Sequence, residues 1–384
     1  MNVLARLARR LRSRLCRTRA SISPDVPDAA FVELCYQRLL GRPSDPQGKE
    51  LFTRALGQGM ARLDLASAIA SSPEYFGVLV RRLFGGTDLP DLGSLHPQRY
   101  RLSSVVGEQR TLPTFDAGSP EAFDWIESMI QSCGFYERAG EWSLAIDTDK
   151  QVMAEIAGRF SPGRVLDMGC STGAILHLLN QQGIRAEGVE ISHLALGLSY
   201  HDIRPQIHFG DLLSLGLEPG FDLILCLDIL EHLNPNRIDS YIARCASLLR
   251  PGGFLFANIP VFGRDTLFGE VFRMYFKEWT DDAARGRPFS LLHVDDRGWP
   301  INGHLIWADP AWWQRLFAQH GLQREAEVEK AIRIVYGAHF ARTTPGRSTF
   351  FLFSRQAAQH DCAAIAARVL SSRSKFVTTE GGTP

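Results

Sequence analysis

The spacing of hydrophobic positions predicts a small helical domain over residues 28–84. Apolar side chains recur there every three or four residues, which places them on one face of a helix. On the first helix these side chains are Phe31, Val32, Cys35, Leu39 and Leu40. Gly41 follows them and suits a left-handed C-terminal cap. Further helices are expected from Ser44 and from Ser72, where serine and proline stand at capping positions.

Beyond residue 120 the hydrophobic pattern changes in kind. Short apolar runs alternate with helical segments, and this order is typical of a parallel sheet covered by helices. Strands are predicted over 164–168, 185–190, 207–209, 221–227 and 254–259, and helices over 174–180 and 238–249. The pattern therefore predicts an α/β, doubly wound fold that follows the small all-helical domain.

Three segments connect or end these domains. Residues 85–120 are rich in Gly and Pro and are expected to be a linker. Residues 261–308 form an insertion far longer than a usual strand-to-helix connection, and it is expected to be a lid. A lid helix is predicted from Leu267, Phe268, Val271, Phe272, Tyr275, Phe276 and Trp279. Residues 356–384 are expected to be a tail with one short helix at 363–370.

The insertion carries further aromatic side chains at Phe289, Trp299 and Trp307. Aromatic rings stack on sugars and on aromatic ligands, but rings at helical spacing also pack simply against each other. Both interpretations stay open at the level of sequence.

Composition excludes several classes of protein. The 384 residues contain 42 basic and 42 acidic side chains, so no overall field gathers nucleic acid, and no nucleic-acid partner is expected. The seven cysteines show no paired spacing, which argues against disulfides and against zinc and favours the cytoplasm. No apolar run reaches the ~18 residues of a membrane span.

Residues 1–20 depart from this balance because they contain seven arginines and no acid. Leucines at helical spacing make the segment a basic amphipathic leader, a pattern typical of peripheral contact with an anionic membrane. A solvated leader and a mitochondrial presequence have similar patterns. The predicted location is therefore the cytoplasm, with peripheral contact at the inner face of the membrane as one alternative.

The string VLDMGCSTG predicts a ligand site at the end of the first strand. Ligands of parallel sheets collect beyond the carboxyl ends of the strands. Asp167 ends the strand, Gly169 and Gly173 permit a tight turn, and the helix from Ala174 offers unpaired N–H groups. Glu190 ends the next strand, where a carboxylate can accept both hydroxyls of a ribose.

A dinucleotide-binding site also uses a carboxylate at this position to bind a ribose. It requires the motif G-x-G-x-x-G, however, and here Ser171 and Ala174 replace two of its glycines. The string instead resembles the first motif of class I S-adenosylmethionine-dependent methyltransferases. FDLILCLDILEHL and LLRPGGFLFANIP resemble that family's fourth- and fifth-strand motifs. The resemblance implies a Rossmann-like, mostly parallel sheet of seven strands within residues 121–355, with S-adenosylmethionine as cofactor.

The resemblance also implies the residues that hold the cofactor, and in it Asp167 acts on the methionine portion. They are Asp167, Gly169, Cys170, Ser171, Gly173, Glu190, Ile191, Asp211, Leu212, Asp228 and Ile229. The strings FVELCYQRLLGRPSDPQG and SSPEYF in turn resemble a small helical bacterial domain of unknown function. That domain is often joined to glycosyltransferases and methyltransferases, which is only an association with glycan metabolism.

Methyl transfer to a hydroxyl requires alignment and a base. His304 and His232 are the candidate bases because both are expected near the carboxyl edge of the sheet, and Glu231 is a third candidate. His293 lies near two aspartates, but that segment is expected to be a solvated loop, and no metal site is predicted.

The predicted function is methylation of a small molecule or glycan, on oxygen, in bacterial polysaccharide or natural-product biosynthesis. Two alternatives are an adaptor that keeps the methyltransferase fold without turnover and an NAD-dependent enzyme acting on nucleotide sugars.

Overall fold

The computed structural model describes residues 26–70, 72, 74–75, 77–79, 89–138, 142–267, 269–272, 276–286, 289–343, 350–356 and 359–372. The chain divides into two compact units, Met1–Leu83 and Phe84–Pro384. The basic leader over residues 1–20 lies outside the described residues, so membrane contact stays a prediction. None of the described helices combines the length and apolarity needed to cross a bilayer.

The first unit is helical, as predicted. It contains α2 (Asp28–Cys35), the π-helical turn η2 (Tyr36–Leu40), α3 (Pro46–Gly57) and α4 (Arg62–Ala70). Gly41 has the left-handed conformation expected of a helix end. Phe31, Val32 and Leu65 pack in its core. The helix expected from Ser72 lies largely outside the described residues.

The second unit is built on a mixed sheet of seven strands in the described part of the chain, in the order β11-β12-β7-β6-β3-β4-β5. These strands are β3 (Arg164–Met168), β4 (Arg185–Glu190), β5 (Ile207–Phe209), β6 (Phe221–Leu227), β7 (Leu249–Asn258), β11 (Gln323–Arg324) and β12 (Phe350–Ser354). The sheet is parallel from β5 to β7, whereas β12 is antiparallel to both of its neighbours. The predicted fold class is confirmed.

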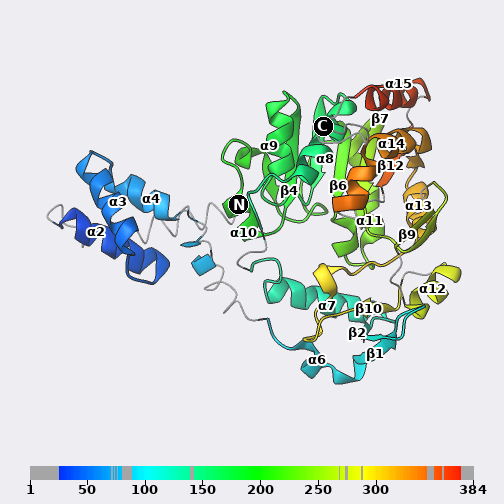
Figure 1. The fold of residues 1–384 in the computed structure, drawn as a ribbon, viewed down its shortest axis with the longest axis horizontal. Helices are drawn as coiled ribbons and strands as arrows, with labels where there is room; N and C mark the ends of the chain where they lie inside the picture. The colour runs from blue at the N-terminus through cyan, green and yellow to red at the C-terminus, as the bar shows by residue number, and fades with distance from the viewer. Residues whose placement is uncertain are drawn as a thin grey trace, which may run out of the picture. The chain divides into compact units, whose positions relative to one another are not determined.

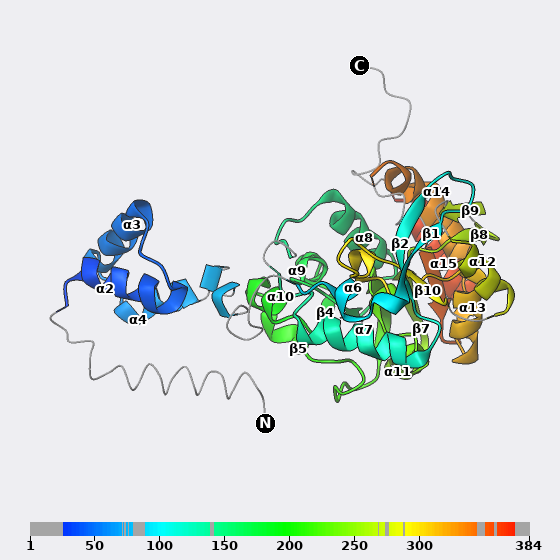
Figure 2. The same cartoon turned by 90° about the horizontal axis from the view of Figure 1, so that it is seen from below.

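Helices cover both faces of the sheet (Figures 1 and 2). They are α7 (Pro120–Ser132), α8 (Thr148–Arg159), α9 (Ala174–Gln181), α10 (His193–Leu198), α11 (Ile238–Leu248), α13 (Pro310–Gln319), α14 (Ala326–Thr343) and α15 (Gln359–Leu370). On β6, Leu223 and Leu225 pack on one face with α8, α9, α14 and α15. Ile224 and Cys226 point to the other face, with α7, α11 and α13.

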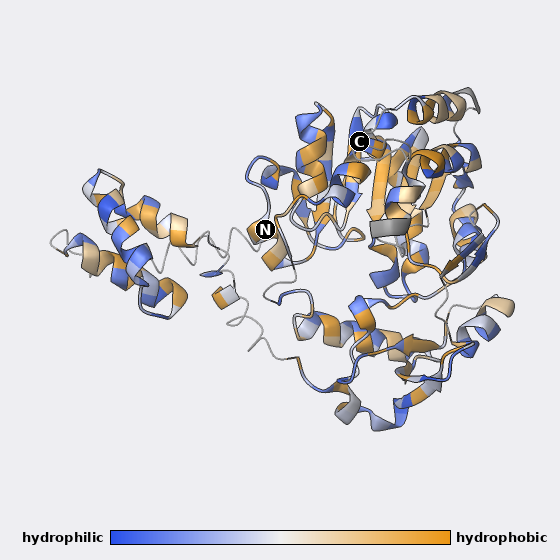
Figure 3. Ribbon diagram, viewed as in Figure 1, coloured by the Kyte–Doolittle hydropathy of each residue, from blue (hydrophilic) through white to orange (hydrophobic). Residues whose placement is uncertain are grey.

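The central strands β6 and β7 carry continuous runs of buried apolar residues, 223–226 and 254–257, as expected of strands buried on both faces (Figure 3). Each fully buried Leu or Phe side chain contributes about 1.5–3 kcal/mol. The same sheet order brings the carboxyl ends of β3, β4, β5 and β6 to one edge.

The linker predicted over 85–120 is wrong for residues 92–116, which are ordered. They form α6 (Leu92–Leu95), η3 (Pro97–Arg99), β1 (Tyr100–Ser104) and β2 (Thr111–Asp116). β2 pairs with β10 (Leu291–His293), a strand of the distant insertion, and the three strands lie together in Figure 1. The sequence could not show this pairing because strands β3 to β7 lie between the two partners along the chain.

The lid helix predicted over 267–279 is also wrong. The insertion forms the hairpin β8 (Gly263–Asp265) and β9 (Gly269–Phe272), and a helix, α12 (Lys277–Ala284), begins only afterwards. Hydrophobic residues in a short run satisfy both a helical and a strand pattern, so spacing alone could not decide between them. The short helices η4 (Arg204–Gln206), η5 (Leu230–His232) and η6 (Ile301–Gly303) complete the unit.

The aromatic side chains of the insertion form a core instead of a stacking surface. Trp279 and Trp307 stack with ring centroids 5.0 Å apart and planes 11° apart. Phe289 and Trp299 are buried as well, and none of the four lines the cavity described below. The structure therefore supports packing, not contact with a ligand. We call residues 89–138 and 261–308 together the cap.

Candidate active site

A cavity of about 900 Å³ lies at the carboxyl edge of the sheet. Its lining includes all but one of the eleven residues predicted to hold a cofactor. The ten are Asp167, Gly169, Cys170, Ser171, Glu190, Ile191, Asp211, Leu212, Asp228 and Ile229. They come from the ends of β3, β4, β5 and β6, so the sheet order explains why they meet.

The turn after β3 has left-handed residues at Gly169, Ser171 and Gly173. A Cβ atom on Gly169 would lie 2.7 Å from the side chain of Ile229, and one on Gly173 would lie 2.3 Å from Ile203. Both glycines therefore serve conformation and close packing. Gly173 does not line the cavity, so its place is at the start of α9, where it packs against Ile203.

Glu190 is fixed in place by backbone N–H groups. Its carboxylate accepts hydrogen bonds from Ser171 (2.8 Å), Ile191 (2.8 Å) and Ser192 (2.7 Å). Burial raises the pKa of Glu190, and these three hydrogen bonds oppose the rise. Ile191 beside it is 51% exposed although it is aliphatic, which leaves an apolar surface for a ligand at the cavity wall.

Asp167 is a buried carboxyl group, with 3% of its surface exposed. Burial, followed by the negative charge of Glu190, raises the pKa of Asp167 to about 8. Among the described residues no cation forms an ion pair with it. A positively charged ligand group at this position would restore the ionised form, so Asp167 and Glu190 fit the ammonium, sulfonium and ribose of S-adenosylmethionine.

Asp211 is held by two residues that sequence reasoning missed. Its Oδ2 accepts a hydrogen bond from the Tyr241 hydroxyl (2.8 Å) and forms an ion pair with Arg237 (3.3 Å). Arg237 also pairs with Glu127 of α7, which ties the cap to the strand edge. Tyr241 lies in the helix predicted over 238–249, where no local pattern marks it as a site residue. No local pattern identified Arg237.

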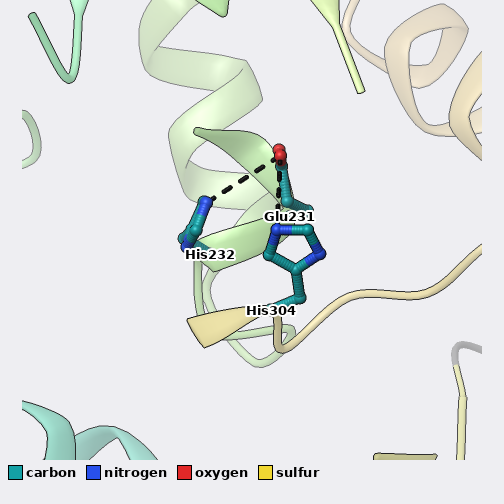
Figure 4. A group of neighbouring side chains, drawn as sticks. All are labelled: Glu231, His232 and His304. Carbon is teal, nitrogen blue, oxygen red and sulfur yellow. Dashed lines mark ion pairs between the residues drawn. The ribbon is translucent and has the colours of Figure 1, made fainter. Parts of the chain in front are cut away.

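The three candidate catalytic residues cluster beside the cavity (Figure 4). Glu231 Oε1 lies 3.8 Å from His232 Nε2 and 3.9 Å from His304 Nε2. His232 lines the cavity, whereas Glu231 and His304 lie behind it. Burial lowers the pKa of His232 to about 4. Burial, followed by the nearby His232, lowers the pKa of His304 to about 3, so both rings are neutral at pH 7.

The same three residues are the group in the described part of the chain whose spacing could hold a metal ion, with all ligand atoms within 4.8 Å of one another. The absence of a metal stays a prediction, and metal binding at this cluster would contradict it. His293 is not part of the group. It lies on β10 within the cap.

The cap contributes a further residue that the sequence did not indicate. The Tyr136 hydroxyl lies 3.0 Å from His232 Nδ1, and both residues line the cavity. A Cβ atom on Gly303 would lie 2.5 Å from that hydroxyl, so the absence of a side chain there leaves room for it. Tyr136 stands outside every motif, and its contact joins positions 96 residues apart.

Comparison with known proteins identifies the sheet and its edge. Residues 144–325 match the family model described as a methyltransferase domain. Residues 144–325 of this chain are a methyltransferase domain. The cofactor of such domains is S-adenosylmethionine, as the sequence predicted. Residues 17–78 match a second model, described as a domain of unknown function (DUF4214).

Curated relatives match parts of the methyltransferase domain. A ubiquinone biosynthesis O-methyltransferase from Burkholderia thailandensis is 29% identical over 147 residues, which cover 34% of this chain and 62% of the relative. A protein of the same name from Dechloromonas aromatica is 33% identical over 123 residues, covering 30% of this chain and 50% of the relative. The chain thus spans less than two thirds of the length of these relatives.

Solved structures are similar at lower identity. An amino pentose methyltransferase from Micromonospora echinaspora is 20% identical, with a TM-score of 0.37, covering 55% of this chain and 92% of that chain. A 1,6-didemethyltoxoflavin-N1-methyltransferase from Burkholderia thailandensis is 16% identical, with a TM-score of 0.40, covering 66% and 97%.

Proposed function

We propose that this protein transfers a methyl group from S-adenosylmethionine to a hydroxyl group of a small molecule or glycan. The observation that carries the proposal is the pairing of two features at one cavity. Asp167 is a buried acid that pairs with no cation among the described residues, and His232 is a neutral imidazole on the same lining. The cofactor, when bound, supplies a methyl group on a sulfonium, which makes the transfer a direct displacement.

Three residues divide the work at the acceptor. Neutral His232 is the proposed base and takes the proton at Nδ1, the nitrogen that faces Tyr136. Glu231 lies on the opposite side of the ring, 3.8 Å from Nε2, where its charge stabilises the imidazolium that forms. His304 is not the base in this scheme, because it does not line the cavity.

The acceptor is proposed to be a hydroxyl compound of bacterial polysaccharide or natural-product biosynthesis. The support for a glycan is the association of the N-terminal domain of unknown function with glycosyltransferases. The support for oxygen is a neutral base beside the cavity, and the matched relatives are named as O-methyltransferases.

Calorimetry with S-adenosylmethionine and with NAD tests the cofactor assignment. We expect binding of the first and none of the second. Glu190→Gln should weaken binding by about 1.5–3 kcal/mol, the scale for lost hydrogen bonds to a charged group. Glu187→Gln is the matched control, because Glu187 lies on the same strand, pairs with Arg164 and does not line the cavity. Equal affinities of the two variants would remove Glu190 from the site.

A further inference from the structure

The cavity has a second side, which the cap forms. The cap residues in its lining include Gln131 of α7, Tyr136, Asn302 of η6 and Leu305. A volume of about 900 Å³ lies near the upper end of the range for ligand pockets, about 300–1,000 Å³. The cap side is therefore the place for the methyl acceptor beside the cofactor.

The cap side carries three neutral polar groups, Gln131, Tyr136 and Asn302, beside the carboxylates of Glu127 and Glu137. Gln131 and Asn302 are exposed to the cavity, and neither amide makes a hydrogen bond within the described part of the chain. Asn302 has a left-handed backbone (φ 55°, ψ 10°). An amide both donates and accepts, so two amides and the Tyr136 hydroxyl match the hydroxyl groups of an uncharged ligand.

Charge around the cavity opposes an anionic ligand. Among the described lining residues, seven side chains are carboxylic acids and two are cationic, Lys150 and Arg237. Both cations already have partners. Lys150 pairs with Asp147 at 3.2 Å, and Arg237 pairs with Glu127 and Asp211.

A carboxylate or phosphate on the acceptor would therefore enter a partly buried site without an unpaired protein cation to meet it. Burying an unpaired charge is strongly unfavourable, and nearby carboxylates add repulsion. A hydroxyl compound without charge avoids both costs and can use the free amides.

We infer that the cap side of the cavity, around Gln131, Tyr136 and Asn302, is an acceptor site that selects uncharged, hydroxyl-bearing molecules and excludes their acids. The inference rests on the proposed function and adds the chemical class of the acceptor. It assigns selection to the cap, whereas the strand ends hold the cofactor.

Two matched pairs of probes test the selection: methyl 3,4-dihydroxybenzoate against 3,4-dihydroxybenzoate, and methyl glucoside against methyl glucuronide. Each is titrated by calorimetry into the full chain saturated with sinefungin, a stable analogue with an amine in place of the sulfonium. We expect the neutral member of at least one pair to bind at least tenfold more tightly than its acid. A smaller preference in both pairs, or no binding by any probe, overturns the inference.

Gln131→Lys adds a positive charge on an exposed position of the cap side, and Gln131→Met is its uncharged control. The lysine variant should raise the affinity of the acid relative to its neutral partner at least fivefold, and the methionine variant should leave that ratio within twofold. An unchanged ratio with lysine would show that charge does not set the selection. Sinefungin binding in the first step separates this failure from a failure of the cofactor assignment.

Discussion

Asp167 shows at the scale of one residue how the fold shapes the proposed cofactor site. The carboxyl ends a buried strand beside Glu190, and burial with that neighbouring charge raises its pKa to about 8. In the free protein at pH 7 the group is therefore mostly protonated. A bound cation favours the ionised form, so binding must release a proton.

This linkage predicts that affinity for S-adenosylmethionine increases with pH. Below about pH 8 the rise should approach tenfold per pH unit, and above about pH 8, where the free carboxyl is already ionised, affinity should level off. Calorimetry at pH 7 in two buffers with different ionisation enthalpies measures the released proton. Asp167→Asn should abolish both the release and the pH dependence. Proton release that persists in this variant would assign the effect to another group.

His232 is the second residue whose surroundings decide its chemistry. His232→Gln should lower turnover by roughly a hundredfold to ten-thousandfold, the usual scale for loss of a general base. Affinity for S-adenosylmethionine should hardly change. Because the pKa of His232 is lowered to about 4, turnover at saturating substrates should stay level as pH falls to about 5, well below the ordinary histidine value.

His320→Gln is the control for this experiment. His320 follows the last residue of α13, pairs with Asp239 of α11 and does not line the cavity. If turnover survives in His232→Gln, the transfer depends on the alignment of donor and acceptor and needs no protein base. A loss seen with His304→Gln but not with His232→Gln would reverse the roles assigned to the two rings.

At the scale of elements, the cap is assembled from two segments of chain, one before β3 and one after β7 in the sequence. β1 and β2 precede the sheet, β10 comes from the insertion after β7, and the antiparallel register joins Phe115 to Leu292 and Asp116 to Leu291. Trp279 donates a hydrogen bond from its ring nitrogen to the Leu291 carbonyl at 2.5 Å. The cap is thus a folded layer whose aromatic residues share one hydrophobic core with a face of the sheet.

Helix α7 of the cap contacts the loop that follows β6. Asn234 donates to Asp124 and Glu127 of α7, each at 2.8 Å, and Arg237 pairs with Glu127 as well. These contacts hold the acidic face of α7 against the loop after β6. The position of Gln131, one turn further along α7, follows from them.

At the scale of the whole molecule, the cavity belongs entirely to the unit Phe84–Pro384. A protein of residues 84–384 should therefore bind S-adenosylmethionine within about twofold of the full chain, because independent units contribute additively to within about 0.5 kcal/mol. Calorimetry on the two proteins at equal concentration checks this. A loss of tenfold or more in affinity would give the N-terminal domain a part in the cofactor site.

Sequence by itself determined the features that depend on neighbouring residues. The strands β3 to β6 and the turn after β3 were predicted at nearly their observed bounds, because buried strands and glycine turns have local patterns. Asp167 and Glu190 follow directly from those strand ends, since parallel strands end at a common edge. Ten of the eleven predicted residues consequently line one cavity in the described structure.

Only the tertiary structure decided which groups meet across long separations. Tyr136 reaches His232 over 96 positions, and Arg237 reaches Glu127 over 110, and neither contact leaves a trace in a local window. The aromatic residues of the insertion likewise had a pattern that fitted a lid, a helix or a core. Their burial against each other, and the pairing of β2 with β10, come from the packing of distant segments, which hydrophobic spacing along the chain does not encode.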